Sequence, residues 1–311
     1  MEMEQGTKRY KLIVAYDGTR YKGFQRQLIG DEKNSASLRQ HKRRRVEDKN
    51  GKAVQVPLTI QECIEEALGH YSGLNRVELK VRFAGRTDGG VHAKGQVVVT
   101  SLPENLGETW LIRKSINSRL PVDISIEDVS LCKNQAFDPR AEVKRKRYTY
   151  QMKYRRKVKS DDGSILPVCS SGPHTIRSGL DPPYVWICPW ALDDCKMDEY
   201  CQRLTGKHDY SAFVHKKNRR DKDNVLTVEK VECEMIHETM ERAPITTVQF
   251  VVEAKGFRRA MVRNIVGFLV DVCRGVLEES IFHQLWEGGD DIASKVHSAP
   301  ACGLCLEHVE Y

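Results

Sequence analysis

The stretch FAGRTDGGVHAKGQVVV, residues 83–99, places a glycine-rich loop carrying Asp88 between two apolar, strand-like segments. The loop has no GK[ST] ending, so it is not a phosphate-binding P-loop. The strand after it is not the helix that a dinucleotide fingerprint needs. Glycines give the backbone unusual freedom, and loops on rigid scaffolds often carry function. Asp88 is therefore a candidate nucleophile, general base or metal ligand, or else an Asx-turn residue that only stabilises the loop.

Two places in the sequence contain part of a metal-ligand pattern. His92 could join Asp88, but two ligands do not make a site. Cys302 and Cys305 form one CxxC, for which two further ligands at suitable spacing are not evident, and both thiols can equally belong to a C-terminal strand. We therefore expect no metal site.

Strands and helices alternate on both sides of this loop. The first half is expected to contain a helix that starts at the capping box Thr59–Glu62 and another at 108–118, with strands at 9–16, 77–83, 96–101 and 124–131. The second half is expected to contain a helix that starts at Asp193 or Asp194 and another at 257–276, with strands at 147–152, 225–235, 246–255 and 303–311. Each half thus has the order βαββαβ.

This repeated order predicts an α+β fold built from two tandem ferredoxin-like halves. The expected boundaries are 8–136 and 137–311, with a polar, charge-rich insertion at about 30–56 in the first half and a long loop at 155–185 in the second. The halves are expected to form a mixed, mainly antiparallel sheet, with helices on its outside and a central cleft where they meet.

The helix expected at 257–276 is apolar on nearly all sides, which predicts that it is buried. Arg263 lies in this helix. A buried arginine without a partner costs several kcal/mol, so Arg263 is expected to meet a carboxylate. Alternatively, it shares one polar seam with Arg259 and faces solvent or phosphate.

The charge distribution points to a polyanionic partner. The chain has 311 residues and a net charge of +7, with basic runs at 41–45, 144–147, 155–157 and 216–222. Each run alone could be a solvated loop, but together they favour nucleic acid and a basic cleft.

The chain has no run of about 18 apolar residues that would span a membrane. Its start lacks a signal or transit pattern, so a cytoplasmic or nuclear location is expected. The ten cysteines are scattered, which indicates reduced thiols rather than disulfides.

The chain resembles the TruA family of tRNA pseudouridine synthases in six motifs, which occur in the family's order. GRTDGGVHAKGQVV is similar to the family's active-site motif GRTDAGVHA. The other five segments are YDGTRYKGFQRQ at 16–27, FDPRAEVKRKRYTY at 137–150, GKHDYSAF at 206–213, FRRAMVRNIVG at 257–267 and APACGLCLEHVEY at 299–311. The resemblance implies the pseudouridine synthase fold, which agrees with the tandem βαββαβ pattern.

The resemblance also implies roles for individual residues. Asp88 aligns with the catalytic aspartate, and Arg263 aligns with the arginine that pairs with that carboxylate. The remaining aligned residues contact the substrate: Arg86 helps to take the target nucleotide out of the RNA stack, Tyr148 stacks on the target base, and Gly303 and Leu304 line the uracil pocket. Three departures from the family pattern occur. Gly89, next to Asp88, stands in place of alanine, which is a mild change. Ala141 in place of an aromatic residue and the segment 224–228 concern local RNA contacts and not the catalytic centre.

The implied activity is isomerisation of uridine to pseudouridine in tRNA, most often in the anticodon stem-loop region. The N1–C1′ bond breaks and C1′ joins C5, with no redox step, so no cofactor is expected. Asp88 could attack C1′, attack C6 or remove the 2′ proton. The resemblance leaves a homodimer open. Two alternatives remain: a catalytically silent tRNA-binding or folding module, and a metal-dependent nucleic-acid enzyme that uses Asp88 and His92.

Overall fold

The computed structural model describes residues 6–26, 44–47, 53–56, 59–157, 176, 181–214, 223–238, 245–286 and 290–311. The chain divides into two compact units, Met1–Glu142 and Val143–Tyr311. The basic run at 216–222, most of the run at 41–45, and most of the stretches expected as an insertion at 30–56 and a loop at 155–185 lie outside the described residues.

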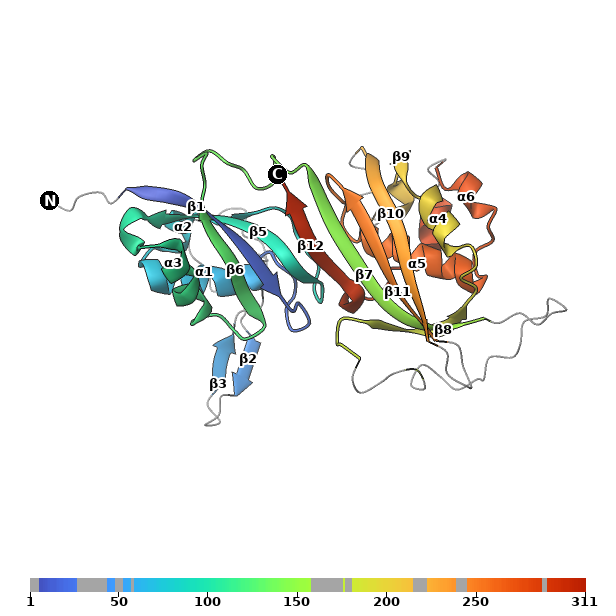
Figure 1. The fold of residues 1–311 in the computed structure, drawn as a ribbon, viewed down its shortest axis with the longest axis horizontal. Helices are drawn as coiled ribbons and strands as arrows, with labels where there is room; N and C mark the ends of the chain where they lie inside the picture. The colour runs from blue at the N-terminus through green and yellow to red at the C-terminus, as the bar shows by residue number, and fades with distance from the viewer. Residues whose placement is uncertain are drawn as a thin grey trace. The chain divides into compact units, whose positions relative to one another are not determined.

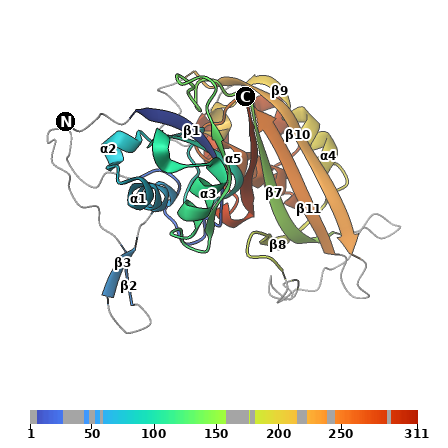
Figure 2. The same ribbon diagram turned by 60° about the vertical axis from the view of Figure 1, so that its left-hand side comes forward.

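The first unit contains an antiparallel sheet in the order β6-β1-β5-β4 (Figure 1). Its strands are β1 (Thr7–Tyr16), β4 (Arg82–Phe83), β5 (His92–Pro103) and β6 (Ile124–Leu131). Successive strand side chains point to opposite faces, so β1 buries every second residue: Tyr10, Leu12, Val14 and Tyr16. Helices α1 (Ile60–Ser72) and α3 (Thr109–Asn117) contact each other and cover this unit's core (Figure 2).

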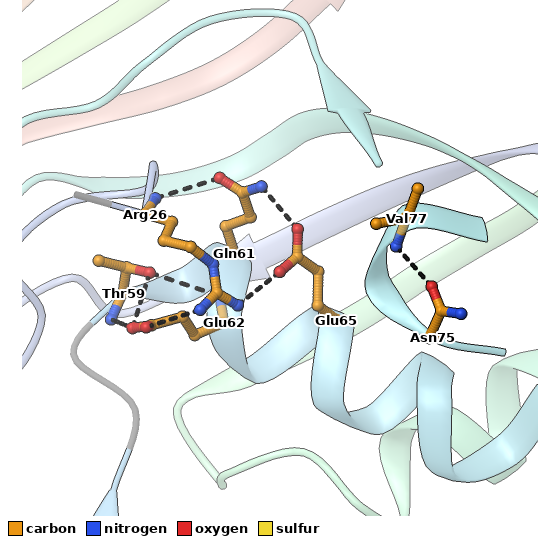
Figure 3. Close-up of polar contacts among 7 residues, drawn as sticks. All are labelled: Arg26, Thr59, Gln61, Glu62, Glu65, Asn75 and Val77. Atoms are coloured by element: carbon orange, nitrogen blue, oxygen red, sulfur yellow. Dashed lines mark hydrogen bonds and ion pairs between the residues drawn. The ribbon is translucent and has the colours of Figure 1, made fainter. Parts of the chain in front are cut away.

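The strand expected at 77–83 is wrong over most of its length. Residues Arg76–Leu79 form a helical turn, α2, and only Arg82–Phe83 pair as a strand. Asn75 caps the turn, because its side-chain oxygen accepts hydrogen bonds from the amide of Val77 (Figure 3) and from that of Glu78. This local capping outweighs the alternation of apolar residues that suggested a strand.

The capping box at the start of α1 is confirmed, and it continues into a buried ion cluster (Figure 3). Arg26 donates to Glu62 at 3.1 Å and also to Glu65. The three side chains are 16%, 4% and 6% exposed. The first free amides of α1, at Ile60 and Gln61, donate to the carbonyls of Gly23 and Phe24. The helix start therefore fixes the segment that follows β1.

A two-stranded ribbon lies within the stretch at about 30–56 that the sequence predicted to be a polar, charge-rich insertion. Strands β2 (Arg44–Glu47) and β3 (Ala53–Val56) pair antiparallel and form a sheet of their own (Figure 1). Alternation over four residues at a time is too short to distinguish such a ribbon from a loop.

The second unit contains a mixed, mainly antiparallel sheet in the order β12-β7-β11-β10-β9. Its antiparallel strands are β7 (Arg145–Arg156), β9 (Gly206–Asp209), β10 (Val225–Glu238), β11 (Ile245–Ala254) and β12 (Leu304–Glu310). A parallel strand, β8 (Trp186–Leu192), joins β7. Helix α4 (Met197–Arg203) packs on β10 and on α5 (Met261–Arg274). Two short helices, α6 (Ile281–Gln284) and α7 (Asp290–Lys295), precede the last strand.

Two helix starts in the second unit differ from those expected. Helix α5 begins at Met261 rather than 257, because Ala260 has a φ of +59° and breaks the helical path. Helix α4 begins after Lys196 without a side-chain cap. The carboxylate of Asp194 instead accepts hydrogen bonds from Tyr154 and Arg156, at 2.8 and 2.7 Å. The expected burial of α5 is confirmed over nearly its whole length.

We expect Arg26→Met to destabilise the protein by about 3–5 kcal/mol, because it leaves two buried carboxylates without their cation. Denaturant-induced unfolding measures this. The triple variant Arg26→Met/Glu62→Gln/Glu65→Gln should recover most of the loss, and the exposed control Arg76→Met should lose little. Equal stability of Arg26→Met and Arg76→Met would show that the cluster does not stabilise the fold.

Candidate active site

In the first unit, the loop that carries Asp88 lies against the segment that follows β1. The amide of Phe24 donates to the carbonyl of Thr87 at 3.2 Å, and Gly23 forms an antiparallel bridge with Asp88. Gly23 has a φ of +110°, and a Cβ there would lie 2.7 Å from the Thr87 carbonyl oxygen. The hydroxyls of Tyr16 and Thr87 share a buried hydrogen bond of 2.8 Å. The motifs at 16–27 and 83–99 therefore pack against each other and are joined by hydrogen bonds.

The start of the 17–24 segment is equally close to the end of the loop. A Cβ on Gly18 would lie 2.0 Å from the carbonyl oxygen of Val91, so only glycine fits there. The Gly18 amide lies 3.2 Å from Nδ1 of the buried His92, and Asp17 Oδ1 lies 3.1 Å from the same nitrogen. Burial opposes ionisation of Asp17, but hydrogen bonds from Thr19 and the adjacent His92 outweigh it and lower the pKa of Asp17.

Asp123 holds the same segment from its other side. Its carbonyl accepts from the Asp17 amide at 2.9 Å. Its carboxylate accepts from Arg20 Nε at 2.8 Å and from the Tyr21 hydroxyl at 2.7 Å. Burial and this hydrogen bond raise the pKa of Tyr21. The segment is thus held between Asp123 and the loop that carries Asp88.

The start of the loop that carries Asp88 is fixed to β5, and its end is closed by a turn. Before Asp88, the side-chain amide of Gln96 donates to the Gly85 carbonyl at 2.8 Å, and the Ala84 amide donates to the Val97 carbonyl at 2.9 Å. After it, the Val91 amide donates to the Asp88 carbonyl at 3.2 Å. Asp88 is half-buried and Arg86 is exposed. The backbone therefore presents a carboxylate and a guanidinium from a short, anchored turn.

In the second unit, Tyr148 lies on β7 and is nearly buried. Its ring meets Phe257 edge-on, with ring centroids 5.3 Å apart. Leu306 of β12 is its partner across the sheet, and Leu304 pairs with Tyr150. Gly303 is required by space, because a Cβ there would lie 2.6 Å from the Tyr150 ring.

Arg263 projects from α5 toward the segment before β12. Its Nε donates to the Ala299 carbonyl at 2.7 Å, and the Ala299 amide donates to the Arg263 carbonyl at 3.0 Å. A Cβ on Gly267 would lie 2.0 Å from the His297 carbonyl oxygen, so glycine permits this approach. Burial and the nearby Cys302 raise the pKa of Tyr150, while the charge of Arg263 opposes the shift. Arg263, Gly303 and Leu304 thus gather around Tyr150, two residues from Tyr148.

The structure therefore brings the candidate residues together in two groups. Asp88 and Arg86 share the loop of the first unit, and Tyr148, Arg263, Gly303 and Leu304 lie together in the second. The expected proximity of Asp88 and Arg263 joins the two units and stays a prediction.

Two of the basic runs are largely paired within the second unit. Arg145 contacts Glu310 at 2.7 Å and Glu253 at 3.5 Å, and Arg147 contacts Glu253 at 2.6 Å. In the other run, Arg156 pairs with Asp194, and Lys157 donates to the carbonyl of Arg274 at 2.8 Å. The interpretation of these runs as phosphate-binding patches is therefore weakened, because carboxylates already pair with Arg145, Arg147 and Arg156.

Three further features of the described residues concern metal ligands, cysteines and membrane helices. None of its His, Cys, Asp and Glu residues form a group of three or more that could hold a metal. The nine cysteines among the described residues are free thiols. No described helix has the length and apolar character needed to cross a membrane.

Comparison with known proteins supplies the assignment. A family model described as tRNA pseudouridine synthase matches residues 200–311. A protein of Thermodesulfovibrio yellowstonii named tRNA pseudouridine synthase A is 31% identical over 304 residues, covering 97% of this chain and 98% of its own. The chain belongs to the family of tRNA pseudouridine synthases.

Further members of this family agree over similar lengths. A tRNA pseudouridine synthase A of Maridesulfovibrio salexigens is 31% identical, over 98% of this chain and 90% of its own. A crystal structure of an unknown protein from Galdieria sulphuraria covers 84% of this chain at 11% identity with a TM-score of 0.20, and it adds nothing to the assignment. The family resemblance inferred from the six motifs is confirmed.

The sequence did not indicate several residues that hold the candidate site. Tyr16 opens the motif at 16–27, but neither its contact with Thr87 nor the contacts of Asp123 with the segment after β1 leave a local signal in the sequence. His92 did carry a signal, since it lies in the active-site motif, but its position beside Gly18 depends on a contact across 74 residues.

We expect Gly267→Ala to destabilise the second unit by about 3 kcal/mol, because the new methyl group displaces the segment that binds Arg263. Gly256→Ala is the matched control, since a Cβ there meets nothing within 4 Å. Denaturant-induced unfolding compares the two. Similar midpoints for both variants would contradict the close approach of α5 and His297.

Proposed function

We propose that this protein isomerises uridine to pseudouridine in tRNA, with Asp88 as the catalytic carboxylate. The observation that carries the proposal is the interlocked pair of segments at 16–27 and 83–99, which presents a half-buried Asp88 from an anchored loop. Full-length similarity to proteins named tRNA pseudouridine synthase A supports tRNA as the substrate.

The reaction makes three demands on the site. A carboxylate must reach the ribose or the uracil, uracil must rotate without escaping, and the target nucleotide must leave the RNA stack. Asp88 meets the first demand, by attack at C1′, attack at C6 or removal of the 2′ proton. Tyr148 offers an aromatic face for the base, and Gly303 and Leu304 line the uracil pocket. Arg86, exposed two residues before Asp88, helps to take the target nucleotide out of the RNA stack.

Arg263 completes this proposal as the partner of the Asp88 carboxylate. An adjacent guanidinium favours the ionised form of a carboxyl group. The hydrogen bond from Nε to Ala299 fixes the direction of the Arg263 side chain and supports this role. The second unit thus fixes the guanidinium of Arg263, and the first unit presents the carboxylate of Asp88.

The proposed architecture is two ferredoxin-like domains, 8–136 and 137–311, with a basic cleft between them. The strand order within each unit supports it. In the first unit, β1 lies between β6 and β5, and in the second, β7 lies between β12 and β11. In both, the first strand of the βαββαβ order is flanked by the fourth and the third. We place the target uridine in the anticodon stem-loop region, following the family resemblance.

We expect Asp88→Asn to abolish turnover while leaving tRNA affinity and stability nearly unchanged, because the substitution keeps the shape and removes the charge. Release of tritium from C5 of uridine-labelled tRNA measures turnover, and filter binding measures affinity. Asp128→Asn, exposed on β6, is the matched control and should remain active. Wild-type activity should persist in excess chelator, which excludes the metal-dependent alternative. Turnover by Asp88→Asn at the wild-type rate would overturn the assignment of Asp88, and no release by the folded wild-type protein would favour the silent tRNA-binding module.

The ion pairs of the basic run at 144–147 generate a prediction about tRNA phosphates. We expect Arg147→Gln to leave the salt dependence of tRNA binding nearly unchanged, since Glu253 already pairs with this arginine. Arg86→Gln should lower the slope of log affinity against log salt by about 1, as the loss of one phosphate contact does. Filter binding over a salt series measures both. A larger change in slope for Arg147→Gln than for Arg86→Gln would refute this division of the basic residues.

A further inference from the structure

His92 lies at the closest approach between the two segments of the candidate site. It is 4% exposed, and its Nδ1 lies 3.2 Å from the Gly18 amide nitrogen and 3.1 Å from Asp17 Oδ1. One ring nitrogen cannot accept a hydrogen bond and donate one at the same time. When unprotonated, Nδ1 accepts from Gly18, and when protonated it donates to Asp17. In both states this atom ties β5 to the segment after β1.

The partners of His92 are themselves held in place. Asp17 accepts hydrogen bonds from the amide and the hydroxyl of Thr19, at 2.9 and 2.6 Å. Its own amide donates to the Asp123 carbonyl. The imidazole therefore contacts the Gly18 amide and an anion that other hydrogen bonds hold in place, and its loss removes both contacts.

This anchor leads directly to Asp88. Asp88 and Val91 are the two ends of one turn, which the hydrogen bond from the Val91 amide to the Asp88 carbonyl closes, and His92 is the next residue. The segment that His92 holds at Gly18 returns to the loop at Gly23, which bridges Asp88, and at Phe24, which donates to Thr87. A shift of the segment at Gly18 would therefore move its contacts with Thr87 and Asp88.

We propose that His92 is a positioning residue of the pseudouridine-forming reaction, whose Nδ1 fixes the segment at Asp17 and Gly18 and thereby sets the direction of the Asp88 carboxylate. The inference rests on the proposed function. A displacement of about 1 Å in a reacting group can reduce a rate by about 100-fold, so a side chain that touches no substrate can still control turnover.

Three substitutions separate positioning by Nδ1 from simple filling of space. The amide of asparagine reaches the place of Nδ1, that of glutamine reaches the place of Nε2, and leucine fills the volume without a polar atom. We expect His92→Leu and His92→Gln to lower kcat about 100-fold with KM changed less than about threefold. His92→Asn should stay within about tenfold of the wild type. His70→Leu, on the exposed end of α1, is the control and should be unchanged.

Hydrogen exchange provides a readout that does not depend on activity. Amides at 87–91 should exchange at least tenfold faster in His92→Leu than in the wild type, and those of His92→Asn should remain protected. Equal kcat and equal exchange in His92→Leu and the wild type would overturn the inference, as would equal losses in His92→Leu and His92→Asn with unchanged exchange. If the wild type released no tritium from any tRNA, the proposed function would fail, while the exchange pattern would still decide whether His92 holds the loop.

Discussion

The geometry of the first unit depends on the close approach of two backbone segments, 17–24 and 87–91. Backbone groups approach to this distance only where side chains are absent, and Gly18 and Gly23 provide the two gaps. The hydrogen bond from Phe24 to Thr87 and the bridge between Gly23 and Asp88 then satisfy polar groups that the approach would otherwise bury. The position of the aspartate follows from main-chain contacts, which vary less than contacts between long side chains.

The same physical solution recurs in the second unit. Gly267 lets α5 approach the carbonyl of His297, and Gly303 leaves room for the ring of Tyr150. Next to the first of these contacts, Arg263 and Ala299 exchange two hydrogen bonds. Gly18, Gly267 and Gly303 are therefore explained by close packing. Gly23 needs its positive φ as well as the space.

The sequence predicted elements well where a local signal and the tertiary contacts agree. The helix after Thr59 has both a capping box and an apolar face, and it forms as expected. The strand expected from Val77 failed because Asn75 caps a helical turn, a local contact that alternation does not reveal. The candidate residues were found through motif spacing, whereas the groups that hold them, such as Asp123, depend on contacts across about a hundred positions. Such contacts leave no periodic trace in the chain.

The positive surface charge predicted from basic runs in the sequence differs most from what the structure shows. A run such as KRKR at 144–147 looks like a basic patch, but strand alternation sends Arg145 and Arg147 to the same face of β7. There they meet glutamates from β11 and β12, so the run contributes much less positive potential than its composition indicates. A phosphate gains most from a cation that is not already paired. The basic side chains that bind RNA should therefore be sought outside such runs. Arg86 stands out because it is exposed and lies two residues from Asp88, the carboxylate that we propose for catalysis.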